Sequence, residues 1–409
     1  MATIVLLFAT QQAAAQDQCG VERKIQVKGF TNEVVYKRLS RIYEDIGEEK
    51  YAEAYPQLQQ LLERTRSPYE KAVIRQALAQ VAWTLERYNE ALRHFEIAVE
   101  LNSLPNRTHF SLMYQIAQLY TMQERYNEAL KALDLWLCKV DTKEITSSVY
   151  VLKASIYSHQ KNWRDGIVAI DKAIELDANP KESWFQMKLG AHFELEQYPK
   201  AALTLERMIE LWPAKRTYWM QLSQIYLKLK RNKRALAVVA LAYKNKLLDR
   251  EADIKHLANL YQFLDIPYKA ALVMQTGLEN GMVKDTRKNW EMTGDAWMTS
   301  EEIDEALAAY ENAGKDAKDG KIDLRRGYLL TDMEKWDDGS QALAMAIRKG
   351  GMKDNAVGQA YLLKGMCEFG MGNTRQARDD FGNATRFTST RSAAQQWIKH
   401  MNEERARRS

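Results

Sequence analysis

The sequence predicts an all-α protein, a right-handed α-solenoid of about ten helix–turn–helix repeats closed by a C-terminal capping helix. Three observations predict it. The 409 residues include only 19 Gly and 7 Pro, which favours helix. One short pattern recurs at intervals of 33 to 38 residues, as expected of a repeat array. Polar links such as Ala178-Asn179-Pro180 and Lys349-Gly350-Gly351 separate the intervals and stop the helices.

The recurring pattern marks the second helix of each repeat. It is an aromatic or turn-favouring residue, a small residue three positions later and a large apolar residue four positions after that. Residues three and four apart share one face of a helix, so the small residue lets a neighbouring helix approach and the apolar residue fills the gap. The instances are Tyr51-Ala54-Leu58, Tyr88-Ala91-Phe95, Tyr126-Ala129-Leu133, Trp163-Gly166-Ile170, Tyr198-Ala201-Leu205, Asn232-Ala235-Val239, Pro267-Ala270-Met274, Ile303-Ala306-Tyr310, Trp336-Gly339-Leu343 and Thr374-Ala377-Phe381.

The first helix of each repeat carries the other half of the pattern. Repeat six reads Trp219, Leu222, Ser223, Tyr226, and repeat eight reads Trp290, Thr293, Gly294, Trp297. This spacing resembles the tetratricopeptide repeat family over roughly residues 34–386. Pro56 departs from the pattern, because it falls early in a second helix. The resemblance implies a protein-binding scaffold.

A narrower resemblance rests on the seventh repeat and the entry helix. Residues 240–245, 251–261, 266–271 and 277–281, together with residues 36–39, are similar to periplasmic tetratricopeptide proteins encoded beside TonB–ExbB–ExbD systems in Gram-negative bacteria. This resemblance implies an accessory role in TonB-dependent uptake, with TonB-, ExbB- or ExbD-type proteins as partners and membrane association through them. A scaffold for outer-membrane assembly or polysaccharide export, or a cytoplasmic regulator, are the alternatives.

The N-terminus predicts export to the periplasm. Residues 4–9 are apolar and Ala13-Ala14-Ala15 precede Gln16, as in a signal peptide of residues 1–18. No Lys or Arg precedes the apolar run, so an N-terminal helix and a cytoplasmic location remain the alternative. After it we expect a linker over 19–33, the solenoid over 34–386, and a capping helix with a polar tail over 387–409.

The three cysteines, Cys19, Cys138 and Cys367, form no CxxC motif, so we expect no zinc site. Widely spaced cysteines in a helical array are usually buried thiols. A bridge from Cys19 to another cysteine stays open, as does lipidation of Cys19.

We expect no enzyme activity, no cofactor and no metal. The sequence has no HExxH, GK[ST] or GxSxG motif, and His192 is expected to be a surface or half-buried helix residue. The net charge of +5 is spread along the chain, which argues against a nucleic-acid partner. The one basic run, residues 228–234, is either a solvated turn or a patch for an acidic partner or lipid headgroups.

A partner is expected in the groove that the first helices line in a solenoid. Side chains beside the apolar stripe of those helices face it and mix amides, charges and apolar groups. This lining suits an extended or helical protein segment better than a single charged terminus. The candidate groove residues are Tyr114, Gln118, Ser155, Gln186, Met220, Gln224, Lys255, Asn259 and Glu291.

Overall fold

The computed structural model describes residues 23, 25, 29–315 and 317–408. These residues form 21 α-helices, α2 to α22, and a short 3-10 helix, without any strand among them. The all-α prediction is therefore confirmed. The predicted signal peptide, residues 1–18, and Cys19 lie outside the described residues. In the described part of the chain, no helix is long and apolar enough to cross a membrane.

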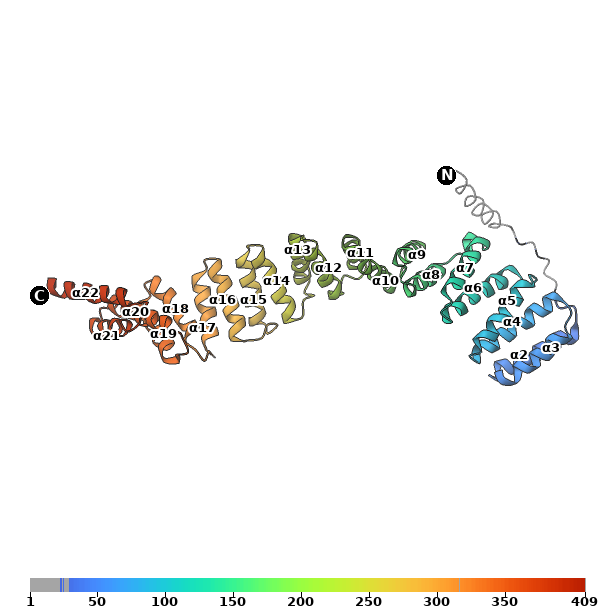
Figure 1. The fold of residues 1–409 in the computed structure, drawn as a ribbon, viewed down its shortest axis with the longest axis horizontal. Coiled ribbons are helices and arrows are strands. Elements are labelled where there is room, and N and C mark those ends of the chain that lie inside the picture. Colours follow the sequence, from blue (N-terminus) through green and yellow to red (C-terminus); the bar gives the residue numbers. More distant parts are fainter. Residues whose placement is uncertain (1–22, 24, 26–28, 316, 409) are drawn as a thin grey trace, which may run out of the picture. The chain divides into compact units, whose positions relative to one another are not determined.

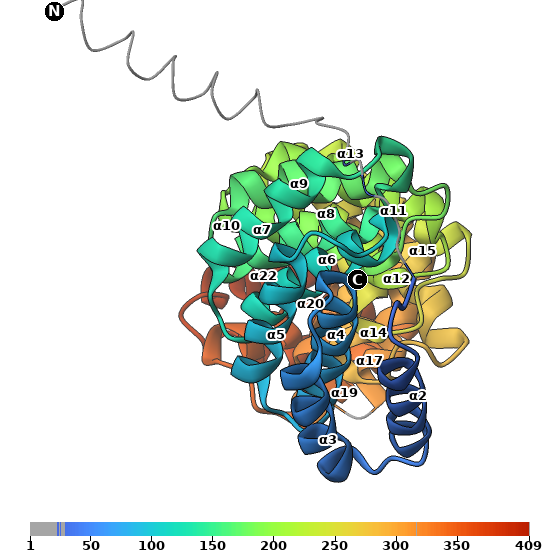
Figure 2. The same ribbon diagram turned by 90° about the vertical axis from the view of Figure 1, so that its right-hand side faces the viewer.

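The chain divides into two compact units, which we describe separately: an N-terminal unit, Met1–Thr204, and a C-terminal unit, Leu205–Ser409. In the N-terminal unit, successive helices lie side by side, as α2, α3 and α4 show in Figure 2. Its helices are α2 (Glu33–Gly47), α3 (Tyr51–Arg64), α4 (Pro68–Thr84), α5 (Tyr88–Glu100), α6 (Asn106–Met122), α7 (Tyr126–Lys139), η1 (Thr142–Glu144), α8 (Ser147–His159), α9 (Trp163–Leu176), α10 (Glu182–Glu194) and the first part of α11 (Tyr198–Leu211).

The C-terminal unit continues the same alternation of first and second helices. Each of α14 to α17 packs against the next one along the chain (Figure 1). The helices of this unit are the remainder of α11, α12 (Arg216–Lys228), α13 (Asn232–Lys244), α14 (Glu251–Phe263), α15 (Pro267–Glu279), α16 (Arg287–Thr299), α17 (Ile303–Lys315), α18 (Lys321–Asp332), α19 (Trp336–Lys349), α20 (Asp354–Gly370), α21 (Thr374–Ala384) and α22 (Arg391–Arg408).

The second helices begin at the first residue of the predicted pattern. For example, α7 begins at Tyr126 and α15 begins at Pro267. The small and large apolar residues that follow are buried. In α7, for example, Ala129 and Leu133 are both 0% exposed. Burying a large apolar side chain contributes about 1.5–3 kcal/mol, so ten such sites stabilise the array through contacts between neighbouring helices.

The turn inside each repeat has one backbone form. Between α6 and α7, the N–H of Arg125 donates to the carbonyl of Tyr120 and Glu124 stands at φ 58°. This left-handed closure ends one helix and starts the next two residues later. The residues at this position are Glu49, Glu86, Glu124, Lys161, Glu196, Lys230, Asp265, Glu301, Glu334 and Gly372.

Each end of the array has one feature of its own. Pro56 lies inside α3 without ending it, since the helix runs on to Arg64. At the other end, α22 packs on α21, and the Trp397 ring stacks on Phe381 with centroids 5.5 Å apart. This covers the apolar surface of the last helix pair, the role expected of a capping helix.

Candidate functional site

A hollow of about 490 Å³ opens between α14 and α16 in the C-terminal unit. It is formed mainly by two first helices, with two residues of α15 between them. Apolar and polar side chains share the lining. They are Ala258, Asn259, Gln262, Ala270, Met274, Lys288, Glu291, Met292, Asp295, Ala296 and Thr299.

The spacing of the buried residues in α14 determines which of its polar side chains line the hollow. Ile254, Leu257 and Ala258 are fully buried and fix the inner face of the helix. Asn259 and Gln262, three residues apart, are therefore exposed together on the face toward the hollow. Their amide groups can both donate and accept hydrogen bonds.

The floor of the hollow is apolar. Met274 is 0% exposed and Ala270 is 2% exposed, both from α15. Met292 of α16 is half-buried beside them. Because methionine is unbranched and polarizable, such a floor adapts to apolar side chains of different shapes.

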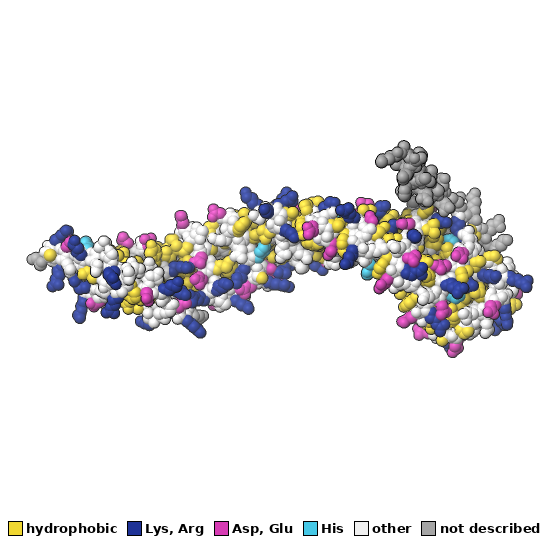
Figure 3. Space-filling view, viewed as in Figure 1, with side chains coloured by type: hydrophobic (Ala, Val, Ile, Leu, Met, Phe, Trp, Pro, Cys, Tyr) yellow, Lys and Arg dark blue, Asp and Glu magenta, His cyan; other side chains and the backbone are white. Residues whose placement is uncertain are grey.

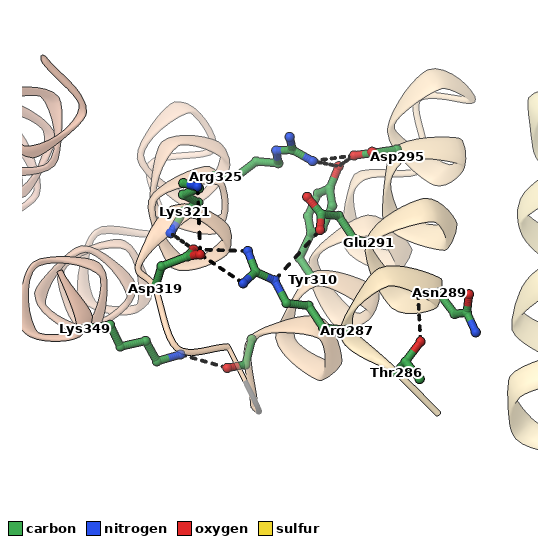
Figure 4. Close-up of polar contacts among 11 residues, drawn as sticks. Thr286, Arg287, Asn289, Glu291, Asp295, Tyr310, Asp319, Lys321, Arg325 and Lys349 are labelled. Atoms are coloured by element: carbon green, nitrogen blue, oxygen red, sulfur yellow. Dashed lines mark hydrogen bonds and ion pairs between the residues drawn. The ribbon is translucent and has the colours of Figure 1, made fainter. Parts of the chain in front are cut away.

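One ion-pair network holds Glu291 in place (Figure 4). The Arg287 guanidinium donates two hydrogen bonds of 3.1 Å to the Asp319 carboxylate. These bonds are the main reason that the pKa of Asp319 is lowered. The same Arg287 lies 3.9 Å from the Glu291 carboxylate. Glu291 therefore faces the hollow beside a cation that is itself fixed by a second repeat.

A second set of contacts holds Asp295, whose carboxylate also lines the hollow. The buried Tyr310 hydroxyl donates to it at 2.7 Å, and Arg325 donates at 2.5 Å (Figure 4). Burial, and then this carboxylate, raise the pKa of Tyr310. The phenol therefore stays protonated and acts as a donor near neutral pH.

A neighbouring hollow of about 470 Å³ continues the surface of the first helices. It reaches from α16 to α18 and α20 and shares Tyr310 and Arg325 with the network around Asp295. Its most exposed aromatic side chain is Tyr328, which is 59% exposed. We call the two hollows together the groove of the C-terminal unit.

All nine sequence-predicted groove residues lie on first helices, but only Asn259 and Glu291 line one hollow together. Lys255 instead pairs with Glu251 at 3.0 Å. Tyr114 packs on Trp136, with ring centroids 5.9 Å apart. Gln186 and Gln224 are exposed, whereas Gln118, Ser155 and Met220 are half-buried.

Sequence reasoning missed Gln262, Lys288 and Asp295 in the lining. The distance along the sequence from these residues to the predicted ones could have identified them. Gln262 lies three residues after Asn259, and Lys288 and Asp295 lie three before and four after Glu291. Residues at these intervals share a helix face.

Two other expectations need correction. His192 is buried, at 2% exposure, and its Nδ1 lies 3.0 Å from the Gln197 side-chain oxygen, so it is not a surface residue. Burial lowers its pKa. The expectation of buried thiols is confirmed for Cys367, a free thiol with 0% exposure, but not for Cys138 at the end of α7, which is half-buried and disulfide-bonded.

The described residues hold no catalytic arrangement that we recognise. Ser223 lies 3.3 Å from the His256 ring, but it is 0% exposed and its hydroxyl donates to the Ala235 carbonyl. A substrate therefore has no access to this hydroxyl. In the same part of the chain, no group of three or more His, Cys, Asp or Glu residues is placed to hold a metal ion.

The helix pairs and their groove define the class of the protein as an α-solenoid of helix–turn–helix repeats. Residues 77–142 and 191–246 match the family model described as Tetratricopeptide repeat. The fold is accordingly an α-solenoid of tetratricopeptide repeats. No curated protein matches the sequence.

Several solved structures are similar in fold. A tetratricopeptide repeat protein from Parabacteroides merdae is 12% identical, with 68% of this chain and 100% of that chain covered and a TM-score of 0.38. MamA from Desulfovibrio magneticus is 16% identical, with 46% and 99% covered and a TM-score of 0.37. YrrB, described as having an unusual peptide-binding site, is 16% identical, with 49% and 100% covered and a TM-score of 0.35.

Proposed function

We propose that this protein is a non-catalytic scaffold that binds a segment of a partner protein in the groove of its C-terminal unit. One observation carries the proposal: the exposed amides of Asn259 and Gln262 stand beside an apolar floor. An amide side chain offers the donor and the acceptor that a peptide backbone requires. The apolar floor of the groove binds an apolar side chain of the same segment.

The acidic side chains that line the groove support binding, because ion pairs hold them in place. Glu291 and Asp295 are oriented by Arg287 and Arg325 before any partner arrives. Side chains that are already ordered lose less conformational entropy on binding. Lys288 makes no ion pair among the described residues, which leaves one cation for an acidic or carbonyl group of the partner.

We further propose that the protein works in the periplasm as an accessory of a TonB-type system. The resemblance of the seventh repeat and the apolar start of the sequence support this location. The disulfide at Cys138 supports it too, because disulfides persist in oxidising compartments. Scaffolding of outer-membrane assembly or polysaccharide export is the second candidate, and the identity of the captured partner separates the two.

The test is capture of partners from crosslinked cells with the full chain, followed by mass spectrometry. The groove variant carries Asn259→Ala and Gln262→Ala. The control variant carries Gln186→Ala and Gln224→Ala, two exposed amides outside the hollow. Losing two hydrogen bonds of about 1 kcal/mol each predicts a fall in partner recovery of roughly ten-fold or more for the groove variant alone.

Equal recovery by the two variants would reject the groove as the binding site. The same samples report on location. A mature N-terminus near Gln16 together with TonB-type proteins among the partners supports the periplasmic role. An intact Met1 with cytosolic partners contradicts it.

A further inference from the structure

The turn between α12 and α13 forms a hollow of about 580 Å³ within the C-terminal unit. Four of its six lining residues are cations, and the lining includes no carboxylate. We call it the basic hollow. Its lining residues are Lys230, Arg231, Asn232, Lys233, Arg234 and Leu264.

The cations of the basic hollow are exposed and largely without partners. Lys230, Arg231 and Lys233 make no ion pair within the described part of the chain. Arg234 lies over the Tyr226 ring, 5.8 Å from its centroid, which fixes its direction. Over the face drawn in Figure 3, Lys and Arg side chains are scattered among acidic and apolar ones. Several unpaired like charges in one place repel one another, so the arrangement favours an anionic ligand.

The repeat itself does not require these charges. The matching turn residues elsewhere in this unit are Asp265, Glu301, Glu334 and Gly372, whereas this turn has Lys230. All of these residues adopt the same left-handed backbone form. The positive charge of this one turn is therefore not needed for folding.

The backbone adds to the attraction for anions. Helix α13 begins in the hollow, and no side chain caps its N-terminus. The first N–H groups of a helix and its dipole together favour a negative charge, a phosphate above all. A phosphate group thus meets backbone donors and cationic side chains at the same place.

An exposed aromatic residue directly precedes one of the lining residues of the basic hollow in the chain. Phe263 precedes Leu264 in the chain and is 68% exposed. An acidic polypeptide needs only the cations. A lipid surface uses both features, since its headgroups attract cations and its acyl boundary accepts an aromatic ring.

We propose that the basic hollow binds the phosphate headgroups of an anionic lipid bilayer, with Phe263 entering the headgroup boundary. This contact is independent of the groove and of the partner bound there. It holds the C-terminal unit at a membrane surface by charge and one aromatic side chain.

The test is co-sedimentation of the full chain with vesicles of phosphatidylglycerol and phosphatidylcholine, against vesicles of phosphatidylcholine alone. The hollow variant is Lys230→Gln, Arg231→Gln and Lys233→Gln. The control variant is Lys284→Gln, Lys318→Gln and Lys353→Gln, which removes three exposed cations from the links of the same unit. Circular dichroism checks that both variants are folded.

The full chain should bind the anionic vesicles and release them at high salt. The hollow variant should lose on the order of ten-fold or more in partition, the control much less, and Phe263→Ala several-fold. Inorganic phosphate added as competitor should reduce binding only weakly. No vesicle binding, equal loss in both triple variants, or binding to polyglutamate but not to vesicles would each overturn the proposal.

Discussion

Glu86 stands at φ 60° in the turn between α4 and α5, a backbone form that glycine adopts without steric cost. A residue with a Cβ pays about 1–2 kcal/mol there, part of which is balanced by the greater freedom of glycine in the unfolded chain. Glu86→Gly should therefore raise the free energy of unfolding by about 0.5–1 kcal/mol, measured by urea denaturation.

The control for this prediction is Gln59→Gly, an exposed position in the interior of α3. Glycine in a helix interior costs about 1 kcal/mol, so this variant should be less stable than the parent. If Glu86→Gly destabilised the protein to the same extent, the positive φ would not be the source of strain in this turn.

His109 is a residue whose burial should couple stability to pH. It is 6% exposed, and burial, with smaller contributions from Arg23 and Lys139, lowers its pKa to about 4. The unfolded chain takes up this proton near pH 6.5, but the folded chain does so only near pH 4. Stability should therefore fall as the pH drops from about 6.5 to about 4, and His109 should account for on the order of 2–3 kcal/mol of that fall.

Thermal melting of the parent and of His109→Gln across this pH range checks the prediction. Glutamine does not titrate, so the variant should lose less stability on acidification. Parallel curves for the two proteins would show that His109 does not contribute to the acid sensitivity.

At the scale of a helix pair, the close contact between α16 and α17 depends on Gly294. A Cβ placed on Gly294 would lie 2.6 Å from the ring of Tyr310, which is 1% exposed. Gly294→Ala should therefore lower the free energy of unfolding by about 1–3 kcal/mol through overpacking.

Gly190 provides the matched control, because it also lies inside a first helix, α10, but a Cβ there would meet no atom within 4 Å. Gly190→Ala should raise helix stability by about 1 kcal/mol, so the two substitutions should act in opposite directions. Urea denaturation of both variants checks this. Stabilisation by both substitutions would indicate that helix propensity, rather than packing, decides the effect at Gly294.

The sequence predicted the helix pairs well because the constraint on them is periodic. Each second helix needs a small residue where it crosses its neighbour, and Ala129 in α7 or Ala235 in α13 shows where that crossing lies. The first helices carry fewer such residues. His192 was misplaced because the pattern does not say which polar side chains, like that of Gln197, satisfy a buried group.

The groove was harder to predict than the helices. Asn259 and Glu291 were found by their offset from the apolar stripe. The position of Glu291 depends on Arg287 and Asp319, two residues 32 positions apart whose side chains form hydrogen bonds between repeats. Solvent-exposed side chains follow no repeat spacing, so such pairs cannot be read from one sequence.

At the scale of the whole molecule, the net charge of +5 conceals local differences. Within the C-terminal unit, the groove carries both signs, whereas the basic hollow carries cations only. The first surface suits a mixed polypeptide segment and the second an anionic one. One repeat array can therefore present two binding surfaces without altering its core.

We propose that the groove of the C-terminal unit holds a partner polypeptide. The most direct test is site-specific photo-crosslinking in cells, with a photoreactive residue at Gln262 in the groove or at Leu272 of α15. Leu272 is 47% exposed and does not line the groove, although Ala270 and Met274 on either side of it do. We expect a crosslinked partner from Gln262 and none from Leu272. Equal crosslinking from both positions, or crosslinking from Leu272 alone, would contradict it.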